Sequence, residues 1–350
     1  MIEQGGSDAH FKVGSPPGFR ISGSITPQGN VPLKPEHTEQ IAKALLGDEK
    51  WKMFDETNDL DCSYSVPGVS RFRVNVMRQR GSISLVLRQI PEKIPSFDDL
   101  GLPEICKTLS LKPRGLVLVT GPTGSGKSTT LAAMIDLINS TEQGHILTME
   151  DPIEFVHPDK KCFVNQREIG ADTPDFNQAL KRALRQDPDV ILVGEMRDLE
   201  TIGLAVTAAE TGHLVFGTLH TSSATKTVDR IVNVFPPESQ EQIRMQLSGT
   251  IQGVISQTLL KKVGGGRCAA LEILVATDAV RAMIREAKTS QMITAMQTGA
   301  KYGMRLLEDH LNQLIAEKKI TYEDAIAKAN MPQMIQKGGA RPAQQASAAA

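Results

Sequence analysis

Nine consecutive residues have the types and the spacing of a loop that binds phosphate groups. They are Gly121, Pro122, Thr123, Gly124, Ser125, Gly126, Lys127, Ser128 and Thr129. The apolar run at 116–120 predicts a buried strand before them, and residues 131–138 have the apolar content of a helix. A strand, a glycine loop, Lys-Ser and a helix form the context that a phosphate-binding P-loop requires. The glycines let the backbone wrap closely around an anion, toward which the first N–H groups of the helix point.

Two side chains of this loop indicate which ligand it takes. Lys127 can reach the β- and γ-phosphates of a nucleotide, and the Ser128 hydroxyl can hold Mg²⁺. The sequence therefore predicts a site for a nucleoside triphosphate with its Mg²⁺.

A second segment ends in an acid at a position that suits metal binding. Residues 189–193 form an apolar run that continues into Gly194 and Glu195, where a Walker B motif normally has aspartate. A carboxylate at the C-terminal end of a buried strand beside the P-loop strand can hold Mg²⁺ directly or through water. A surface glutamate after a core strand is the alternative, and the presence of the P-loop favours the metal role.

Three carboxylates follow another expected strand, at 146–149. Glu150, Asp151 and Glu154 lie within five residues, and Pro152 ends the strand between them. This places the acids at the C-terminal edge of the sheet, where ligands of α/β proteins bind. One of them could orient the attacking water, whereas three solvated loop acids are the simpler alternative.

Histidines stand at both ends of a further expected strand, at 214–218. A single histidine is more often structural than catalytic, but both ends of this strand belong to the sheet that carries the P-loop. We therefore favour a functional role for His220. For His213 the two interpretations are equally supported. Neither histidine has other metal-ligating residues beside it, so no metal other than Mg²⁺ is expected.

Strands and helices alternate from about residue 99, which predicts a parallel sheet with crossover helices. The expected strands are 116–120, 146–149, 190–193 and 214–218, and the first expected helices are about 127–139, 175–185, 200–210 and 223–234. After residue 235 an apolar stripe at helical spacing, from Ile243 to Leu259, predicts further helix. A turn at 264–266 predicts a hairpin. The last expected helices are about 278–286, 289–297, 305–317 and 321–329.

Residues 1–98 have a different pattern. Period-two runs at 19–25, 71–76 and 82–88 predict strands, and a helix is expected at 35–46, ended by Gly47. We expect a small α+β domain, joined by a proline-containing linker at about 90–98 to a second domain at 99–335. The low-complexity residues 336–350 are expected to be disordered.

The composition limits the classes of protein to consider. The chain of 350 residues is 40% hydrophobic and 23% charged, so it can bury sizeable cores. Its formal net charge of −1 argues against a nucleic-acid partner gripped by bulk positive charge. No apolar run approaches the ~18 residues of a membrane span. The four cysteines lie far apart, which excludes a cysteine zinc ribbon and fits a cytoplasmic protein.

In combination, these motifs resemble the secretion ATPase superfamily. The motifs are the Walker A loop, an acidic Asp box at 147–154, an atypical Walker B with Glu195, and a His box at 213–220. Within that superfamily the chain is similar to the type IV pilus retraction ATPases, through segments 7–10, 14–17, 194–198, 217–221 and 254–259. The resemblance covers about residues 5–335.

The resemblance implies a fold, an assembly and a function. The fold is α/β, with a RecA-like P-loop ATPase domain after a smaller α+β, PAS-like N-terminal domain. The implied assembly is a homohexamer that binds ATP between subunits. The implied function is an ATP-driven motor for pilus retraction at the cytoplasmic face of the inner membrane. Its implied partner is a membrane platform protein, and it has no transmembrane segment of its own.

The resemblance also assigns roles to individual residues. Glu154 would polarise the attacking water, Glu195 would support Mg²⁺, and His220 would sense the γ-phosphate. The N-terminal arginines that would reach the nucleotide are Arg71, Arg73 and Arg78. Strand alternation permits this for Arg71 and Arg73 because it places them on one face, although a solvated edge is the alternative.

One segment departs from the retraction family. The signature of that family is Ala-Ile-Arg-Asn-Leu-Ile-Arg-Glu, and it corresponds to residues 279–286 of this chain. Here alanine replaces the asparagine and methionine replaces the leucine. Helical spacing places Arg281, Arg285 and Lys288 on one face. Such a run of charge is commonly solvated, but the resemblance favours a face on which Arg281 and Arg285 meet an acidic partner.

Two alternatives to a retraction motor stay open. One is another ring ATPase of the superfamily, for conjugation, secretion or pilus assembly, which differs in partner and not in chemistry. Cys268 alone cannot supply the four-cysteine metal site of the assembly ATPases, and this favours retraction. The other is a non-hydrolysing, nucleotide-gated accessory, which steady-state ATPase activity would distinguish from a motor.

Overall fold

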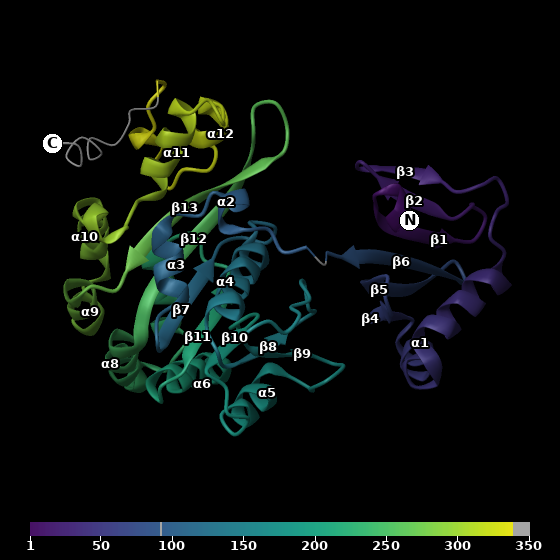
Figure 1. The fold of residues 1–350 in the computed structure, drawn as a ribbon, viewed down its shortest axis with the longest axis horizontal. Coiled ribbons are helices and arrows are strands. Elements are labelled where there is room, and N and C mark those ends of the chain that lie inside the picture. The colour runs from purple at the N-terminus through teal and green to yellow at the C-terminus, as the bar shows by residue number, and fades with distance from the viewer. Residues whose placement is uncertain (92, 339–350) are drawn as a thin grey trace. The chain divides into compact units, whose positions relative to one another are not determined.

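The computed structural model describes residues 1–91 and 93–338. They divide into two compact units, one of residues 1–93 with Glu154–Val156, and one of residues 94–153 with those from 157 onward. Both are mixtures of helix and strand (Figure 1). The tail expected at 336–350 lies outside the described residues from 339 onward, and the backbone N–H of Gln336 donates to Asn312 Oδ1 at 2.9 Å.

The first unit is a six-stranded antiparallel sheet with one long helix. The strand order is β3-β2-β1-β6-β5-β4. The strands are β1 (Gly6–Lys12), β2 (Gly18–Ile21), β3 (Ser24–Pro27), β4 (Asp59–Val66), β5 (Ser70–Gln79) and β6 (Ser82–Ile90). Helix α1 (Pro35–Thr57) packs Ala42 and Phe54 against Val74 and Leu85 of the sheet.

The sequence pattern describes this unit only in part. The single strand expected at 19–25 is wrong, because Ser22 (φ 51°) and Gly23 (φ 89°) make the turn of the β2–β3 hairpin. The helix expected at 35–46 is confirmed. Gly47 kinks it with φ 66°, and the chain then continues as helix to Thr57. Strand β1 was not predicted, since one of its buried residues is Asp8, whose carboxylate pairs with Arg88 at 2.8 Å.

The second unit is built on a seven-stranded sheet of order β13-β12-β7-β11-β10-β8-β9. Neighbouring strands are parallel except for the antiparallel pair β12–β13. The strands are β7 (Gly115–Thr120), β8 (His145–Glu150), β9 (Phe163–Glu168), β10 (Val190–Val193), β11 (Leu214–Leu219), β12 (Ile251–Lys261) and β13 (Arg267–Val275). The four strands predicted in this region are confirmed. Their apolar runs are continuous because both faces of the sheet are covered.

Helices cover both faces of this sheet (Figure 1). On one face lie α2 (Phe97–Leu100), α3 (Glu104–Ser110) and α4 (Lys127–Thr141). On the other lie α5 (Phe176–Ala183), α6 (Leu199–Glu210), α7 (Ala224–Asn233), α8 (Gln240–Thr250), α9 (Asp278–Arg285) and α10 (Met292–Thr298). Helices α11 (Leu307–Ala316) and α12 (Tyr322–Ile326) pack on Leu260 and Ala270 of the β12–β13 hairpin. In the part of the chain described, no helix has the length and apolar character needed to cross a membrane.

The helical stripe predicted from Ile243 to Leu259 is wrong beyond Thr250. Helix α8 ends there, and the next residues form β12, which pairs with β7 on one side and β13 on the other. Nearly every residue from Ile251 to Gln257 is buried. A strand that is covered on both faces has no alternation to distinguish it from a buried helix, so the helical spacing within this apolar run was accidental.

Candidate nucleotide-binding site

The loop between β7 and α4 has a backbone that favours glycine at its tightest points. The φ angle is 142° at Gly121, 77° at Gly124 and 90° at Gly126. A Cβ at Gly121 would lie 2.2 Å from the carbonyl oxygen of Gln257, and a Cβ at Gly126 would lie 2.7 Å from the Gln257 side-chain nitrogen. The loop is therefore held close to β12, with the first N–H groups of α4 facing the space it encloses.

Gln257 also braces the loop with its side chain, a contact that the sequence motif does not include. Its amide nitrogen donates to the Ser125 carbonyl at 2.7 Å, and its amide oxygen accepts from Thr130 Oγ1 at 2.8 Å. The residue is 4% exposed. Both partners flank the start of α4, so Gln257 fixes the loop relative to the helix. The available signal was a long polar side chain inside an apolar run.

Lys127 lies over the loop that precedes it. Its ammonium group donates to the carbonyl oxygens of Gly121 at 2.9 Å and Pro122 at 3.3 Å. Desolvation lowers the pKa of Lys127 and the charge of Glu195 opposes this shift. The interaction with Glu195 connects the P-loop electrostatically to the residue at the end of β10.

Two hydroxyl groups of the loop suit a phosphate with its metal ion. Ser125 is 2% exposed, and its Oγ has no hydrogen-bond partner among the described residues. A buried donor of this kind fits a ligand oxygen, because leaving it unpaired costs free energy. Ser128, at the start of α4, is exposed. No cluster of three histidine, cysteine, aspartate or glutamate side chains that could hold a metal occurs among the described residues. Mg²⁺ does not need one, because it commonly binds one or two protein oxygens together with substrate phosphates.

Glu195 and His220 meet at the carboxyl ends of neighbouring strands. Glu195 Oε1 lies 2.8 Å from His220 Nε2 and 2.7 Å from Arg197 Nε. Burial by itself would raise the pKa of Glu195, but the hydrogen bonds and charges of Arg197 and His220 outweigh it, so the pKa lies below its usual 4.5. Glu195 is therefore ionised near neutral pH. The parallel pairing of β10 with β11 brings these two residues together.

A surface hollow of about 280 Å³ adjoins this pair. Its lining residues are Glu195, Met196, Arg197, Leu219, His220, Thr221 and Arg230. His213 lies at the opposite end of β11, roughly 20 Å away at about 3.3 Å per residue. Its ring nitrogen Nδ1 donates to the Ala208 carbonyl at 2.9 Å. This placement favours the structural interpretation of His213.

The three acids at the end of β8 and in the loop after it have different surroundings. Glu150 Oε1 accepts hydrogen bonds from Thr148 Oγ1 at 2.6 Å and from Gln166 Nε2 at 3.1 Å. Asp151 and Glu154 are exposed. Because Glu150 is engaged by its neighbours, Asp151 and Glu154 are the acids of this segment that remain candidates for acting on water.

The three N-terminal arginines lie on β5 but not on one face. Arg71 donates to Ser63 Oγ at 2.8 Å, and Arg73 Nε lies 3.9 Å from Asp61. Arg78 belongs to the other face, where it pairs with Asp55 at 2.5 Å and lies over the Phe54 ring. The shared face of Arg71 and Arg73 agrees with the alternation, and their roles toward a nucleotide stay predictions.

The expected charged face of 281–288 differs from the observed segment. Helix α9 ends at Arg285, so Lys288 lies beyond it and pairs with Glu286 at 2.7 Å. Arg281 is half-buried, and its Nη1 donates to the Ser248 carbonyl at 2.7 Å. Arg285 is exposed. The expectation that Arg281, Arg285 and Lys288 share one helical face is therefore wrong for Lys288, and Arg285 is the exposed one of the two arginines expected to meet a partner.

Comparison with protein families tests these interpretations. The model of the family described as type II/IV secretion system protein matches residues 59–349, a span that contains the P-loop, Glu195 and His220. The chain belongs to this family. The resemblance inferred from the motifs is thereby confirmed.

The chain is also similar to curated relatives over most of its length. A protein of Pseudomonas aeruginosa described as the type IV pilus retraction ATPase PilT is 54% identical over 331 residues, covering 95% of this chain and 96% of the relative. A twitching motility protein of Neisseria gonorrhoeae is 49% identical over 314 residues, covering 89% and 84%. The crystal structure of the pilus retraction motor PilT with bound ADP has a TM-score of 0.90 at 50% identity, covering 95% and 96%. The predicted α/β fold class is confirmed.

Proposed function

We propose that this chain is an ATP-hydrolysing motor that powers type IV pilus retraction. The observation that carries the proposal is the likeness, over nearly the full length of both chains, to a retraction ATPase and to a retraction motor crystallised with ADP. The glycine backbone of the P-loop and the buried Ser125 hydroxyl support the proposal, because both suit a phosphate ligand. We extend the proposal, as the resemblance of the motifs implies, to a homohexamer in the cytoplasm that acts at the inner membrane on a pilus platform protein.

Binding of ATP uses the P-loop residues Gly121 to Thr129. Backbone N–H groups and Lys127 bind the phosphates, and the buried Ser125 hydroxyl gains a partner. Ser128 and Glu195 would hold Mg²⁺, which neutralises charge on the β- and γ-phosphates when it is bound. The low pKa of Glu195 means that its carboxylate is ionised near neutral pH. This suits the role, because the negative charge of a carboxylate attracts Mg²⁺.

Hydrolysis uses residues around the γ-phosphate. We assign Glu154 to the attacking water and His220, held by Glu195, to sensing the γ-phosphate. Arginines of β5 add positive charge, and we favour Arg71 and Arg73 over Arg78 because those two share one face of the strand, whereas Arg78 lies on the other face beside Asp55. Phosphoryl transfer needs little covalent chemistry from the protein, so these roles are positional and electrostatic.

Phosphate release by the purified chain with MgATP tests the enzymatic part. We expect steady turnover, which a non-hydrolysing accessory would not show. Glu154→Gln should bind ATP normally and turn over roughly 10²–10⁴-fold more slowly, equivalent to about 3–5 kcal/mol of barrier. Wild-type turnover by Glu154→Gln would transfer the role to Asp151, since Glu150 is engaged.

A further inference from the structure

Glu154 belongs to the segment that connects β8 to β9. The side chain is exposed, and its chain neighbours Ile153 and, three positions later, His157 are buried at 4% and 7% exposure. An exposed carboxylate that acts on a single water molecule must have a fixed backbone, because a small displacement of a reacting group is costly. The contacts of the two buried neighbours show what fixes it.

Two side chains of β9 accept hydrogen bonds from the backbone on either side of Glu154. Glu168 Oε2 accepts from the N–H of Ile153 at 3.2 Å. Gln166 Oε1 accepts from the N–H of His157 at 2.8 Å. Because Gln166 and Glu168 are two residues apart on a strand, both point to the same face of the sheet. The segment is therefore held at both flanks by one short stretch of β9.

The Gln166 side chain is itself held by β8. Thr148 and Glu150 stand directly opposite Gln166 and Glu168 in the parallel register. Glu150 Oε1 accepts from both the Gln166 amide and the Thr148 hydroxyl, and these contacts orient the Gln166 oxygen toward His157. The polar side chains of β8 and β9 thus form one connected hydrogen-bond network rather than a set of separate contacts.

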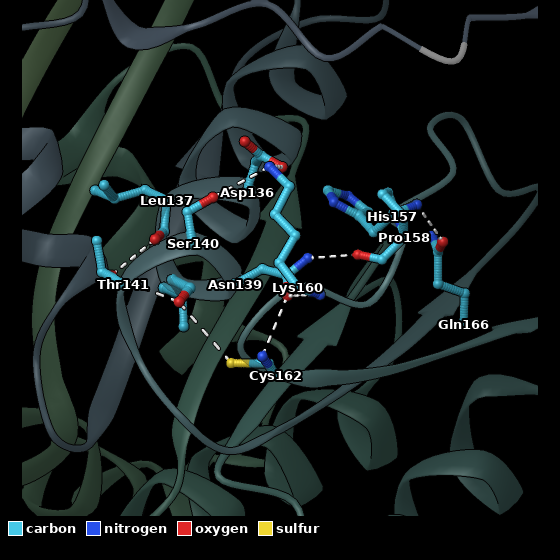
Figure 2. A network of polar contacts seen from close by, with 11 residues as sticks. Asp136, Leu137, Asn139, Ser140, Thr141, His157, Pro158, Lys160, Cys162 and Gln166 are labelled. Carbon is cyan, nitrogen blue, oxygen red and sulfur yellow. Dashed lines mark hydrogen bonds and ion pairs between the residues drawn. The ribbon is translucent and has the colours of Figure 1, made fainter.

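Beyond His157 the segment is tied to the P-loop helix (Figure 2). Asn139 of α4 donates to the Pro158 carbonyl at 2.7 Å and accepts from the Lys160 N–H at 3.1 Å. The Lys160 ammonium pairs with Asp136 at 2.6 Å. Since α4 begins at Lys127, the helix that starts in the phosphate site also holds the far end of the segment.

We propose that Gln166 and Glu168 are positioning residues for Glu154. They do not touch the substrate; they fix the backbone that carries the carboxylate. The inference rests on the proposed role of Glu154 in hydrolysis. It predicts that Gln166 matters to turnover only while Glu154 is present.

The experiment is a double-mutant cycle on ATP turnover, with ADP affinity and thermal unfolding measured in parallel. Gln166→Leu removes the acceptor for the His157 N–H and should lower kcat on the order of 10-fold to 10²-fold, with KM and ADP affinity unchanged. In the Glu154→Gln background the same substitution should cause no further fall, because the group being positioned is already lost.

A conservative pair and a control complete the test. Glu168→Gln keeps an oxygen acceptor and should keep near-wild-type turnover. Glu168→Leu removes the acceptor and should lower kcat as Gln166→Leu does. Asn165→Ala is the control on the same strand, because its side chain is directed to His145 Nε2 at 2.8 Å. Its turnover should be unchanged.

Specific outcomes would overturn the proposal. Equal falls caused by Gln166→Leu with and without Glu154 would show that it acts independently. Full turnover by Gln166→Leu, or loss of ADP binding together with folding, would also reject a positioning role. Wild-type turnover by Glu154→Gln alone is a different failure, since it removes the role of Glu154 in the proposed function.

Discussion

Replacing Arg281 by alanine should destabilise the second unit, whereas replacing Arg285 should not. Arg281 Nη1 donates to the carbonyls of Ser248 at 2.7 Å and Gly249 at 2.9 Å, and its Nε donates to the carbonyl of Ala276 at 3.1 Å. The first two carbonyls belong to the last turn of α8, where helix carbonyls lack intrahelical partners. One guanidinium therefore joins the end of α8 to the start of α9.

The size of the effect follows from these contacts. A hydrogen bond that involves a charged group contributes about 1.5–3 kcal/mol, but the contributions do not add when water can reach the groups left behind. Arg281 is half-buried, and desolvation lowers its pKa below the usual range of a guanidinium. We expect Arg281→Ala to lower the free energy of unfolding by about 2–3 kcal/mol. The exposed Arg285 should change it by no more than about 0.5 kcal/mol when replaced.

Urea unfolding of the two single variants measures this difference. The midpoint should fall for Arg281→Ala with an unchanged slope, and should stay at the wild-type value for Arg285→Ala. Equal midpoints for both variants would refute the reasoning. The same pair separates folding from partner binding. Arg285→Ala should keep ATP turnover and lose retraction in cells if this face meets a partner, and normal motility would reject that idea.

Three further changes test other parts of the account. Gln257→Leu removes the two side-chain hydrogen bonds to the P-loop and the start of α4. It should weaken ADP affinity about tenfold in a fluorescence titration. Unchanged affinity would show that the glycine backbone alone determines the conformation of the loop. Desolvation lowers the pKa of His310 to about 3 from 6.5, so the unfolded chain takes up a proton below pH 6.5 while folded His310 stays neutral until about pH 3. Stability should therefore fall as pH falls through this window, and less steeply for His310→Gln in thermal unfolding between pH 7 and 5; parallel curves would contradict this. Arg71→Ala should slow ATP turnover by roughly 10³-fold or more, which is the rate that an arginine supplied to a phosphoryl-transfer site contributes. Arg78→Ala should slow turnover only severalfold, because Arg78 pairs with Asp55 on the other face of β5. The reverse order would assign that other face to the nucleotide.

The sequence predicts the P-loop and its sheet well because several local signals agree there. The strands β7, β10 and β11 are buried throughout and mostly apolar, and each ends in a distinctive motif. A parallel sheet predicts that Glu195 and His220 lie at the same edge. Their contact depends on β10 and β11 being neighbours, and neither it nor the contact with Arg197 could be predicted.

What the sequence did not predict depends on contacts between distant segments. The hydrogen bonds of Gln257 to the P-loop link residues more than a hundred positions apart, and no local pattern marks them. Helical spacing and the resemblance predict Arg281 at a partner face, because they describe only its own helix, whereas the carbonyls that it binds, of Ser248 and Gly249, lie on α8. The strand β12 was mistaken for helix because burial on both faces removes the alternation that identifies a strand.

The most direct test of the proposed function is to count pili and score surface motility in cells whose only copy of the chain carries Lys127→Ala. The substitution removes the fixed counter-charge of the phosphates, so it should abolish ATP turnover while leaving the fold in place. A retraction motor predicts abundant pili without movement. Cells without pili would indicate an assembly ATPase, and normal motility at normal piliation would contradict the account.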